Sequence, residues 1–398
     1  MRATLIAVSG AALAVVGFTI WGWPASKYLH GDYIQYWLAS RALLDGWDPY
    51  DPVVWRAMHE TVVGSDFFIV PGAGFSYPLT TAVAALPFAT VGVAQSAPLW
   101  FVAQTGSAIA GLVMLQRRSA HGRPGRKVAL LLGLGALIQP VFLLAGEGNI
   151  ARFLVGILSF GLALLVSGSA LAGGVVLGAL IVKPQLFIVF GPAVLLFVAP
   201  SSRLRVVGGV VATVATLLLI SVVLRPNWIQ AWVAQSIHVQ GLYGRVNLWG
   251  DLGAGWVAWV IATATVMALL AWWLVRRPPF LTAAAAALAL SLYVAPYAND
   301  YDAAVLLVCL GAYLAAIDGL PGRTRALLVV LFVATSSAVS WPVWLGFVPN
   351  GWQSELPAPA ACLLLVLADT VARRGRSVGP SAGSRSDPRP VGLTAPSP

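Results

Sequence analysis

The residues best suited to chemistry stand just after the first apolar run, in the acidic and aromatic segment KYLHGDYIQYWLASRALLDGWDPYDP. Asp32 follows a glycine at the start of a helical pattern, and Tyr36 comes one turn later on the same face. A single carboxylate so placed can act as the general base that activates a hydroxyl nucleophile. A carboxylate at a helix start can equally cap unpaired backbone amides. From the residues alone, both roles are open for Asp32.

Lys183 is the second notable residue, because it interrupts an apolar run and is followed by Pro184. A charge within a membrane span costs about 2.5–3.5 kcal/mol on insertion scales, so such residues usually face a cavity or a partner. Proline breaks the helical hydrogen-bond ladder, and a broken helix needs cover from protein or water. We expect Lys183 to contact an anionic substrate group, to pair with a carboxylate such as Glu147, or to snorkel. Gln185 beside it could hydrogen-bond a sugar.

Several further polar residues are candidates for donor or acceptor binding, each with a simpler alternative. Asn149 and Arg152 begin an apolar helix, and the arginine could merely anchor that helix to lipid headgroups. His238 and Arg245 belong to an aromatic loop of the kind found at membrane interfaces. Asp300 could hydrogen-bond an acceptor sugar or simply end a span.

The sequence indicates neither a metal site nor a cofactor. Asp45, Asp48 and Asp51 stand beside a glycine and two prolines, in a pattern typical of turns. Cys309 and Cys362 both fall inside apolar runs, which argues against a disulfide and against a metal site.

The composition is typical of an integral membrane protein. Of 398 residues, 59% are hydrophobic and 10% are charged, and the mean hydropathy is +0.84. Soluble domains carry about 25% charged residues. Apolar runs of roughly 17–25 residues, each long enough to cross a ~30 Å hydrocarbon layer, recur along the chain. We therefore expect an all-α polytopic membrane protein with about 12 transmembrane helices.

The formal net charge of +10 indicates how the chain is oriented in the membrane, and it does not indicate nucleic-acid binding. Short loops with an excess of lysine and arginine stay in the cytoplasm. Basic clusters of this kind occur near residues 117–127, 203–205, 276–277, 323–325 and 373–376. The lipid bilayer is thus an expected partner, and nucleic acid is not.

The charge map gives a membrane path for one domain, residues 1–372, followed by a disordered basic cytoplasmic tail, 373–398. The expected spans are 4–23 (a retained signal anchor), 96–116, 128–145, 149–167, a broken pair at 170–182 and 185–199, 206–224, 256–275, 280–296, 302–317, 326–344 and 357–372. The run 77–92 is expected to be re-entrant or partly inserted, because a full crossing would put the next basic loop outside.

Two long segments, 25–76 and 225–255, are expected on the outer face. The first contains a helical pattern over 32–44 that ends at Gly46. A second short helix is expected near 53–62. The tryptophans and tyrosines of this segment indicate amphipathic helices that lie along the membrane surface.

The segment after the first span resembles the sequence hallmark of glycosyltransferase family 87, a group of GT-C membrane glycosyltransferases. The matching residues are Gly31, Asp32, Tyr36, Ala39, Leu43, Leu44, Gly46, Pro49, Tyr50 and Asp51. Later segments resemble further family motifs in the expected order: FSYPLTTAVAALPF, GEGNIARFLVGILSFGLALL, GALIVKPQLFIVFGPAVLLF and SLYVAPYANDYDAAVLL. The last one departs from many relatives, which carry a histidine where this chain has Asn299, Asp300, Tyr301 and Asp302.

The resemblance implies a GT-C fold and transfer of a sugar, usually mannose, with inversion. The implied donor is a polyprenyl-phosphate sugar. The implied acceptor is a glycolipid or glycan on the outer face of the cytoplasmic membrane. The resemblance also places the catalytic carboxylate at Asp32.

The chemistry of such a transfer suits these residues. A leaving phosphate needs nearby positive charge and no general acid, and the acceptor hydroxyl needs one general base. The carboxylate pair of a glycosidase is therefore unnecessary. The alternatives are a secondary transporter and a non-catalytic membrane assembly protein. Transporters usually carry broken helices in two matching halves, and the sequence offers no counterpart to the break at Lys183 and Pro184.

Overall fold

The computed structural model describes residues 31–64, 72–119, 124–135, 148–242, 275–295, 300–337 and 357–377, with separate positions between 264 and 273. These parts of the chain form α-helices and short 3-10 helices, and no strand occurs in them. The expected all-α class is confirmed for these residues. The expected signal anchor, most of the span at 256–275 and the tail after 377 lie outside them.

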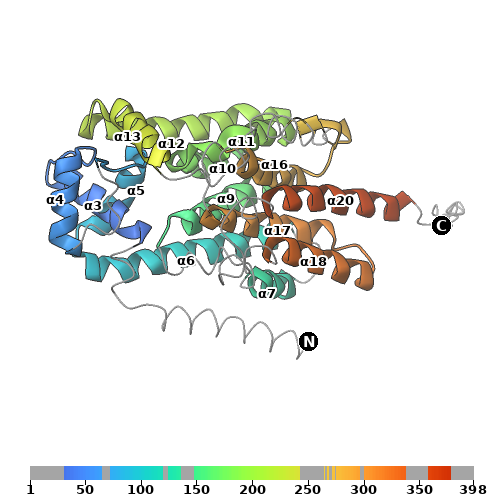
Figure 1. Ribbon diagram of the computed structural model, residues 1–398. Helices are drawn as coiled ribbons and strands as arrows, with labels where there is room; N and C mark the ends of the chain where they lie inside the picture. The colour runs from blue at the N-terminus through green and yellow to red at the C-terminus, as the bar shows by residue number, and fades with distance from the viewer. Residues whose placement is uncertain are drawn as a thin grey trace, which may run out of the picture.

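One end of the molecule contains the first helices of the described chain together with α13 (Figure 1). The helices at this end are α3 (Asp32–Leu44), α4 (Pro52–Val63), α5 (Leu79–Ala89) and α13 (Trp228–Leu242). Asp51 starts α4 by accepting a hydrogen bond from the amide of Val53 at 2.8 Å. Gly64 ends the same helix in a left-handed conformation, with a φ of 73°. The helices expected over 32–44 and near 53–62 are confirmed.

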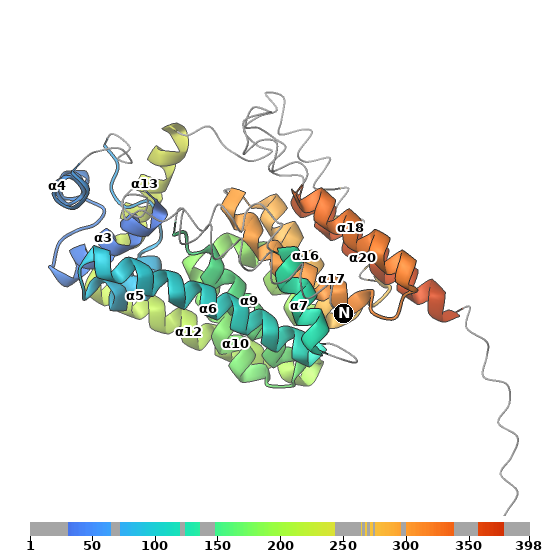
Figure 2. The same ribbon diagram turned by 90° about the horizontal axis from the view of Figure 1, so that it is seen from below.

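The rest of the described chain is a bundle of helices that extends from this end toward the C-terminal end (Figures 1 and 2). Its members are α6 (Val93–Ser119), α7 (Pro124–Gly135), α9 (Ala151–Val166), α10 (Ala170–Gly178), α11 (Phe187–Phe197), α12 (Arg203–Leu224), α16 (Phe280–Val294), α17 (Leu306–Ala316), α18 (Gly322–Ser337) and α20 (Pro357–Ser377). Within it, α6 packs on α9, α10 on α12, α11 on α16, and α16 on α20.

Small residues let α6 and α9 approach each other closely. A Cβ atom on Gly156 would lie 2.1 Å from the hydroxyl of Ser107, so a larger side chain would push the two helices apart. Helices in lipid gain little hydrophobic drive from association, and close packing of small residues is one substitute. This crossing ties α9, and Asn149 just before it, to α6.

Two of the described helices are long and apolar enough to cross a membrane, Val93–Ser119 and Pro200–Leu224. They coincide with the spans expected at 96–116 and 206–224, and they give the chain the character of a membrane protein. α5 has 11 residues, or about 16 Å at 1.5 Å per residue. That length is about half of a ~30 Å hydrocarbon layer. α11 and α17, in segments expected to cross, also have 11 residues each, so the path of 77–92 through the membrane stays a prediction.

The structure differs from the sequence prediction in the surroundings of α3. We expected an amphipathic helix that lies along the membrane surface. Instead nine of its 13 residues are buried, and α3 packs against α5 and α6. The hydroxyl of Ser40 donates to the carbonyl of Ala82 at 2.7 Å, and the indole of Trp37 donates to the carbonyl of Val91 at 3.1 Å. Both contacts tie α3 to the segment that forms α5.

Candidate active site

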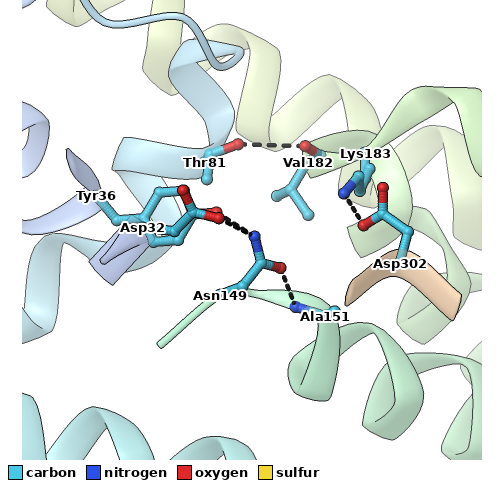
Figure 3. A network of polar contacts seen from close by, with 8 residues as sticks. All are labelled: Asp32, Tyr36, Thr81, Asn149, Ala151, Val182, Lys183 and Asp302. Carbon is cyan, nitrogen blue, oxygen red and sulfur yellow. Dashed lines mark hydrogen bonds and ion pairs between the residues drawn. The ribbon is translucent and has the colours of Figure 1, made fainter. Parts of the chain in front are cut away.

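Asp32 lies at the start of α3 but does not hold the N-cap position. Gly31 is the N-cap residue, in an extended conformation, and Asp32 is the first helical residue. Its carboxylate accepts a hydrogen bond from the side-chain amide of Asn149 at 2.5 Å (Figure 3). A residue from a distant part of the chain therefore orients this carboxylate. The interpretation of Asp32 as the N-cap of its helix was wrong.

Asn149 can present only its nitrogen to Asp32. Its side-chain oxygen accepts a hydrogen bond from the backbone amide of Ala151 at 2.8 Å, which fixes the orientation of the side chain at the start of α9. The amide nitrogen then faces Asp32 and also lies 3.2 Å from the hydroxyl of Tyr36. Asn149 is completely buried. The sequence-based candidates Asp32, Tyr36 and Asn149 thus form one hydrogen-bonded group.

The backbone conformation of Gly148 determines the position of Asn149 at the start of α9. Gly148 has a φ of 64°, a conformation that non-glycine residues adopt only with strain. Its carbonyl accepts hydrogen bonds from the indole of Trp100 at 2.8 Å and from the amide of Gln104 at 3.2 Å. A Cβ atom at this position would lie 2.6 Å from the Cβ of Tyr33 on α3. Only glycine fits between α3 and the start of α9.

We expect Gly148→Ala to unfold at a lower temperature than Gly168→Ala. Both glycines have a positive φ, so both variants carry the cost of a left-handed alanine, about 1–2 kcal/mol. A Cβ on Gly168 meets nothing within 4 Å, whereas one on Gly148 meets Tyr33. The difference in unfolding temperature, measured in detergent, therefore isolates this clash. Equal unfolding temperatures would show that the contact with Tyr33 does not constrain the site.

Tyr36 is fully buried in an aromatic cluster beside Asp32. Its ring packs edge-on against Tyr77, with centroids 5.0 Å apart, and lies 5.8 Å from the ring of Trp100. Burial raises the pKa of the Tyr36 phenol well above its ordinary value, and the negative charge of Asp32 raises the pKa further. Asp302 acts in the same direction. The phenol therefore stays protonated at neutral pH and can donate a hydrogen bond while it accepts one from Asn149.

Lys183 stands at a break in the helical path, as the sequence predicted. α10 continues as a 3-10 turn, η1 (Ala179–Val182), and a second turn, η2 (Pro184–Leu186), precedes α11. The break exposes backbone groups that other elements satisfy. The carbonyl of Val182 accepts a hydrogen bond from the hydroxyl of Thr81 at 3.2 Å. The hydroxyl of Ser291 accepts from the amides of Val189 and Phe190 at 2.9 and 2.8 Å.

The partner of Lys183 is Asp302, which belongs to the 3-10 helix η4 (Asp300–Val305). The two side chains form a buried ion pair, with 5% and 2% of their surfaces exposed (Figure 3). The sequence analysis offered Glu147 as a partner, and that residue lies outside the described part of the chain. The sequence analysis did not single out Asp302 as the partner of Lys183. A signal was present, because a lone lysine in one apolar run needs a carboxylate in another.

A cavity of about 380 Å³ lies beside this ion pair. Its lining comes from the segment before α5, from the broken helix and from α13, and consists of Ser76, Tyr77, Pro78, Val182, Lys183, Pro184, Gln185, Ile188, Trp232, Ser236 and Val239. Among the described residues of this wall, Lys183 is the one with a charged side chain. Gln185, expected beside a sugar, is part of the same wall.

Hydrogen bonds connect the two segments that were expected as long outer loops. The side chain of Gln235 on α13 accepts from the amide of Gly74 at 3.0 Å and donates to the carbonyl of Tyr50 at 3.2 Å. The hydroxyl of Ser236 donates to the carbonyl of Ser76 at 3.2 Å. α13 is therefore held against Tyr50 and against the residues just before α5, and it closes one side of the cavity.

The other candidates lie apart from this group or outside the described residues. The guanidinium of Arg152 donates to Thr105 at 3.1 Å and stacks over Phe101 at 4.7 Å, so it packs against α6. His238 is exposed on α13. Arg245 lies outside the described residues, and only the backbone of Asp300 is described.

The aspartates expected in turns take structural roles. Asp51 caps α4, as described above, and Asp48 accepts from the amide of Tyr50 at 3.0 Å. Asp48 also pairs with Arg225 at 3.1 Å, at the end of α12. Asp45 follows α3 and pairs with Arg41 at 2.9 Å. Each of the three carboxylates therefore has a partner within the protein.

A comparison with protein families identifies a match. Residues 75–297 fit the profile described as glycosyltransferase family 87. The match covers more than half of the chain and includes α5, Asn149 and the break at Lys183. Asp32 and Tyr36 precede the matched range, and Asp302 follows it. A search of curated proteins gives no match.

Proposed function

The chain belongs to glycosyltransferase family 87, and from this premise we propose that it transfers a sugar from a polyprenyl-phosphate donor to a hydroxyl of a glycolipid or glycan. The family resemblance favours mannose as the sugar. We propose further that the chain is a multi-pass protein of the cytoplasmic membrane with its site on the outer face, where the segments 25–76 and 225–255 are expected.

One observation carries this proposal. A carboxylate oriented by Asn149 and a cation beside a cavity come from distant segments and meet in one region, with Val182 between them (Figure 3). An inverting transfer needs this combination, since one group must take a proton and another must stabilise a leaving phosphate. Neither a general acid nor a metal ion is required by the step.

In the proposed step, Asp32 is the general base. Its carboxylate takes the proton of the acceptor hydroxyl while the hydroxyl oxygen attacks the anomeric carbon of the donor sugar. The new bond joins that oxygen to the anomeric carbon, and the bond from the anomeric carbon to the phosphate oxygen breaks. The phosphate leaves with the electron pair, and the proton passes from Asp32 to solvent. Asn149 holds the carboxylate in place throughout.

Lys183 is proposed to stabilise the departing phosphate. Lys183 is a lining residue of the cavity and its side chain is almost fully buried, so an anion bound there would lie beside a positive charge in a poorly solvated site. Fixed charge in such a site is worth more than in water, because the surroundings screen it less. The neutral remainder of the lining suits the apolar first units of a prenyl chain.

The proposal is tested with the purified full chain in detergent, labelled prenyl-phosphate sugars and a membrane lipid extract. We expect a product whose mass exceeds that of a membrane glycolipid or glycan by one sugar, with prenyl-phosphate mannose as the best donor. Transfer from a sugar nucleotide alone would contradict the proposed donor. Uptake of a solute into vesicles without any glycosylated product would support the transporter instead.

A further inference from the structure

The ion pair of Lys183 and Asp302 has an asymmetric relation to the cavity. Both side chains are almost fully buried. Lys183 is part of the cavity lining, whereas Asp302 contacts Lys183 without belonging to that lining. An anion that enters the cavity therefore meets a lysine whose positive charge is already balanced by a carboxylate next to it.

This balance matters because the proposed substrate and product carry different charges. A sugar linked through phosphate to a lipid is a diester with one negative charge. The prenyl phosphate that leaves is a monoester, which carries about −1.5 to −2 at pH 7. A buried lysine without a counter-ion would bind the more highly charged product more tightly than the substrate. The prenyl phosphate product would then dissociate slowly and would inhibit the enzyme.

We infer that Asp302 is the counter-ion that weakens the hold of Lys183 on the product monoester and so allows it to leave. This inference rests on the proposed function. The fixed negative charge of Asp302 repels the extra charge of the monoester more than it repels the diester. Asp302 thus lowers product affinity more than donor affinity, while Lys183 still stabilises charge as it develops on the phosphate. Asp302 is a positioning residue that acts through Lys183.

A purely structural ion pair leads to the opposite result. In that case Asp302 only neutralises a buried lysine, and its removal leaves Lys183 as an uncompensated charge that disturbs the site. Asp302→Asn would then weaken the binding of monoester and diester alike. If Asp302 is a counter-ion, the same variant should bind both anions more tightly, and the monoester most of all.

The test measures the binding of a short prenyl phosphate monoester and its methyl diester to the full chain in detergent by titration calorimetry. For Asp302→Asn we expect the dissociation constant of the monoester to fall by about tenfold or more, and that of the diester by less. Turnover should slow, with a burst of product in the first turnover, because release becomes limiting. Unchanged or weaker monoester binding would overturn the inference.

Two controls keep the test decisive. Asp369→Asn removes another buried carboxylate, which pairs with Arg373 at 2.8 Å on α20, and it should leave the ratio of the two dissociation constants unchanged. The wild-type protein supplies a measurement that does not depend on how Asp302→Asn folds. Wild type should bind the two anions with similar affinity, and a strong preference for the monoester would contradict the role of Asp302.

The outcomes separate this inference from the proposed function. A shift of the binding ratio in Asp302→Asn, without sugar transfer from any prenyl-phosphate donor, would support the counter-ion and overturn the proposed transfer. Sugar transfer by the wild type, with a binding ratio that Asp302→Asn leaves unchanged, would support the transfer and overturn the counter-ion.

Discussion

Asp32→Asn should lose turnover by about 10²–10⁴-fold, the usual contribution of a general base. Gly31 rather than Asp32 holds the N-cap position of α3, so the substitution removes no N-cap of this helix. Asparagine keeps the shape of the side chain but cannot accept the proton of the acceptor hydroxyl. We expect the variant to insert, to fold and to bind donor like the wild type. Single-turnover transfer from a labelled prenyl-phosphate sugar measures the loss.

The matched control for this variant is Asp45→Asn. Asp45 lies at the other end of the same helix and forms a partly exposed ion pair with Arg41. Partly exposed pairs of this kind contribute about 0–1 kcal/mol to stability, and Asp45 follows the last residue of α3 whereas Asp32 is the first. Its removal should leave turnover within about twofold of wild type. An Asp32→Asn enzyme as active as this control would refute the assignment of Asp32 as the base.

Lys183→Met should lower turnover by about 10²–10³-fold, as the loss of one oxyanion donor does in other enzymes. The substitution also leaves Asp302 buried without its ion-pair partner, a change that costs about 3–5 kcal/mol of stability in comparable pairs. Lys183→Arg keeps the charge and should retain part of the activity. Turnover and unfolding temperature are measured on the same detergent-purified samples.

A double variant separates chemistry from stability. Lys183→Met with Asp302→Asn contains no uncompensated charge, so it should recover most of the lost stability while turnover stays low. Arg225→Met serves as the control for loss of a cation at the same end of the molecule, where Arg225 pairs with Asp48. If the double variant also recovers turnover, Lys183 has a structural role only.

The local structure of this chain could be predicted from sequence to a large extent. The bounds of α3 follow from the glycines that flank it, and the break at Lys183 follows from Pro184, which cannot donate a ladder hydrogen bond. The deep burial of α3 was missed, although apolar and aromatic residues occur on every side of this helix. A helix that is hydrophobic all round is typical of a buried position rather than of a surface.

The contacts that assemble the site could not be predicted in this way. Asn149 is 117 positions from Asp32, and Asp302 is 119 positions from Lys183. Periodicity reports on neighbours within a few turns and carries no information about such distances. The orientation of Asn149 depends on a positive φ at Gly148, on two donors from α6 and on the close approach of Tyr33. Each of these becomes visible only once helices are placed in space.

Because of the side chain of Gln235, two segments that are distant in the sequence depend on each other when sequences are exchanged. This side chain joins the carbonyl of Tyr50 to the amide of Gly74, and Gly74 itself lies so close to Tyr50 that a Cβ atom would be 2.6 Å from its carbonyl oxygen. A chimaera that takes α13 from a relative must therefore keep a glutamine at position 235, and one that takes residues 31–78 must keep the glycine at position 74. Loss of Gln235 would leave the backbone carbonyl of Tyr50 and the backbone amide of Gly74 without the side chain that now joins them.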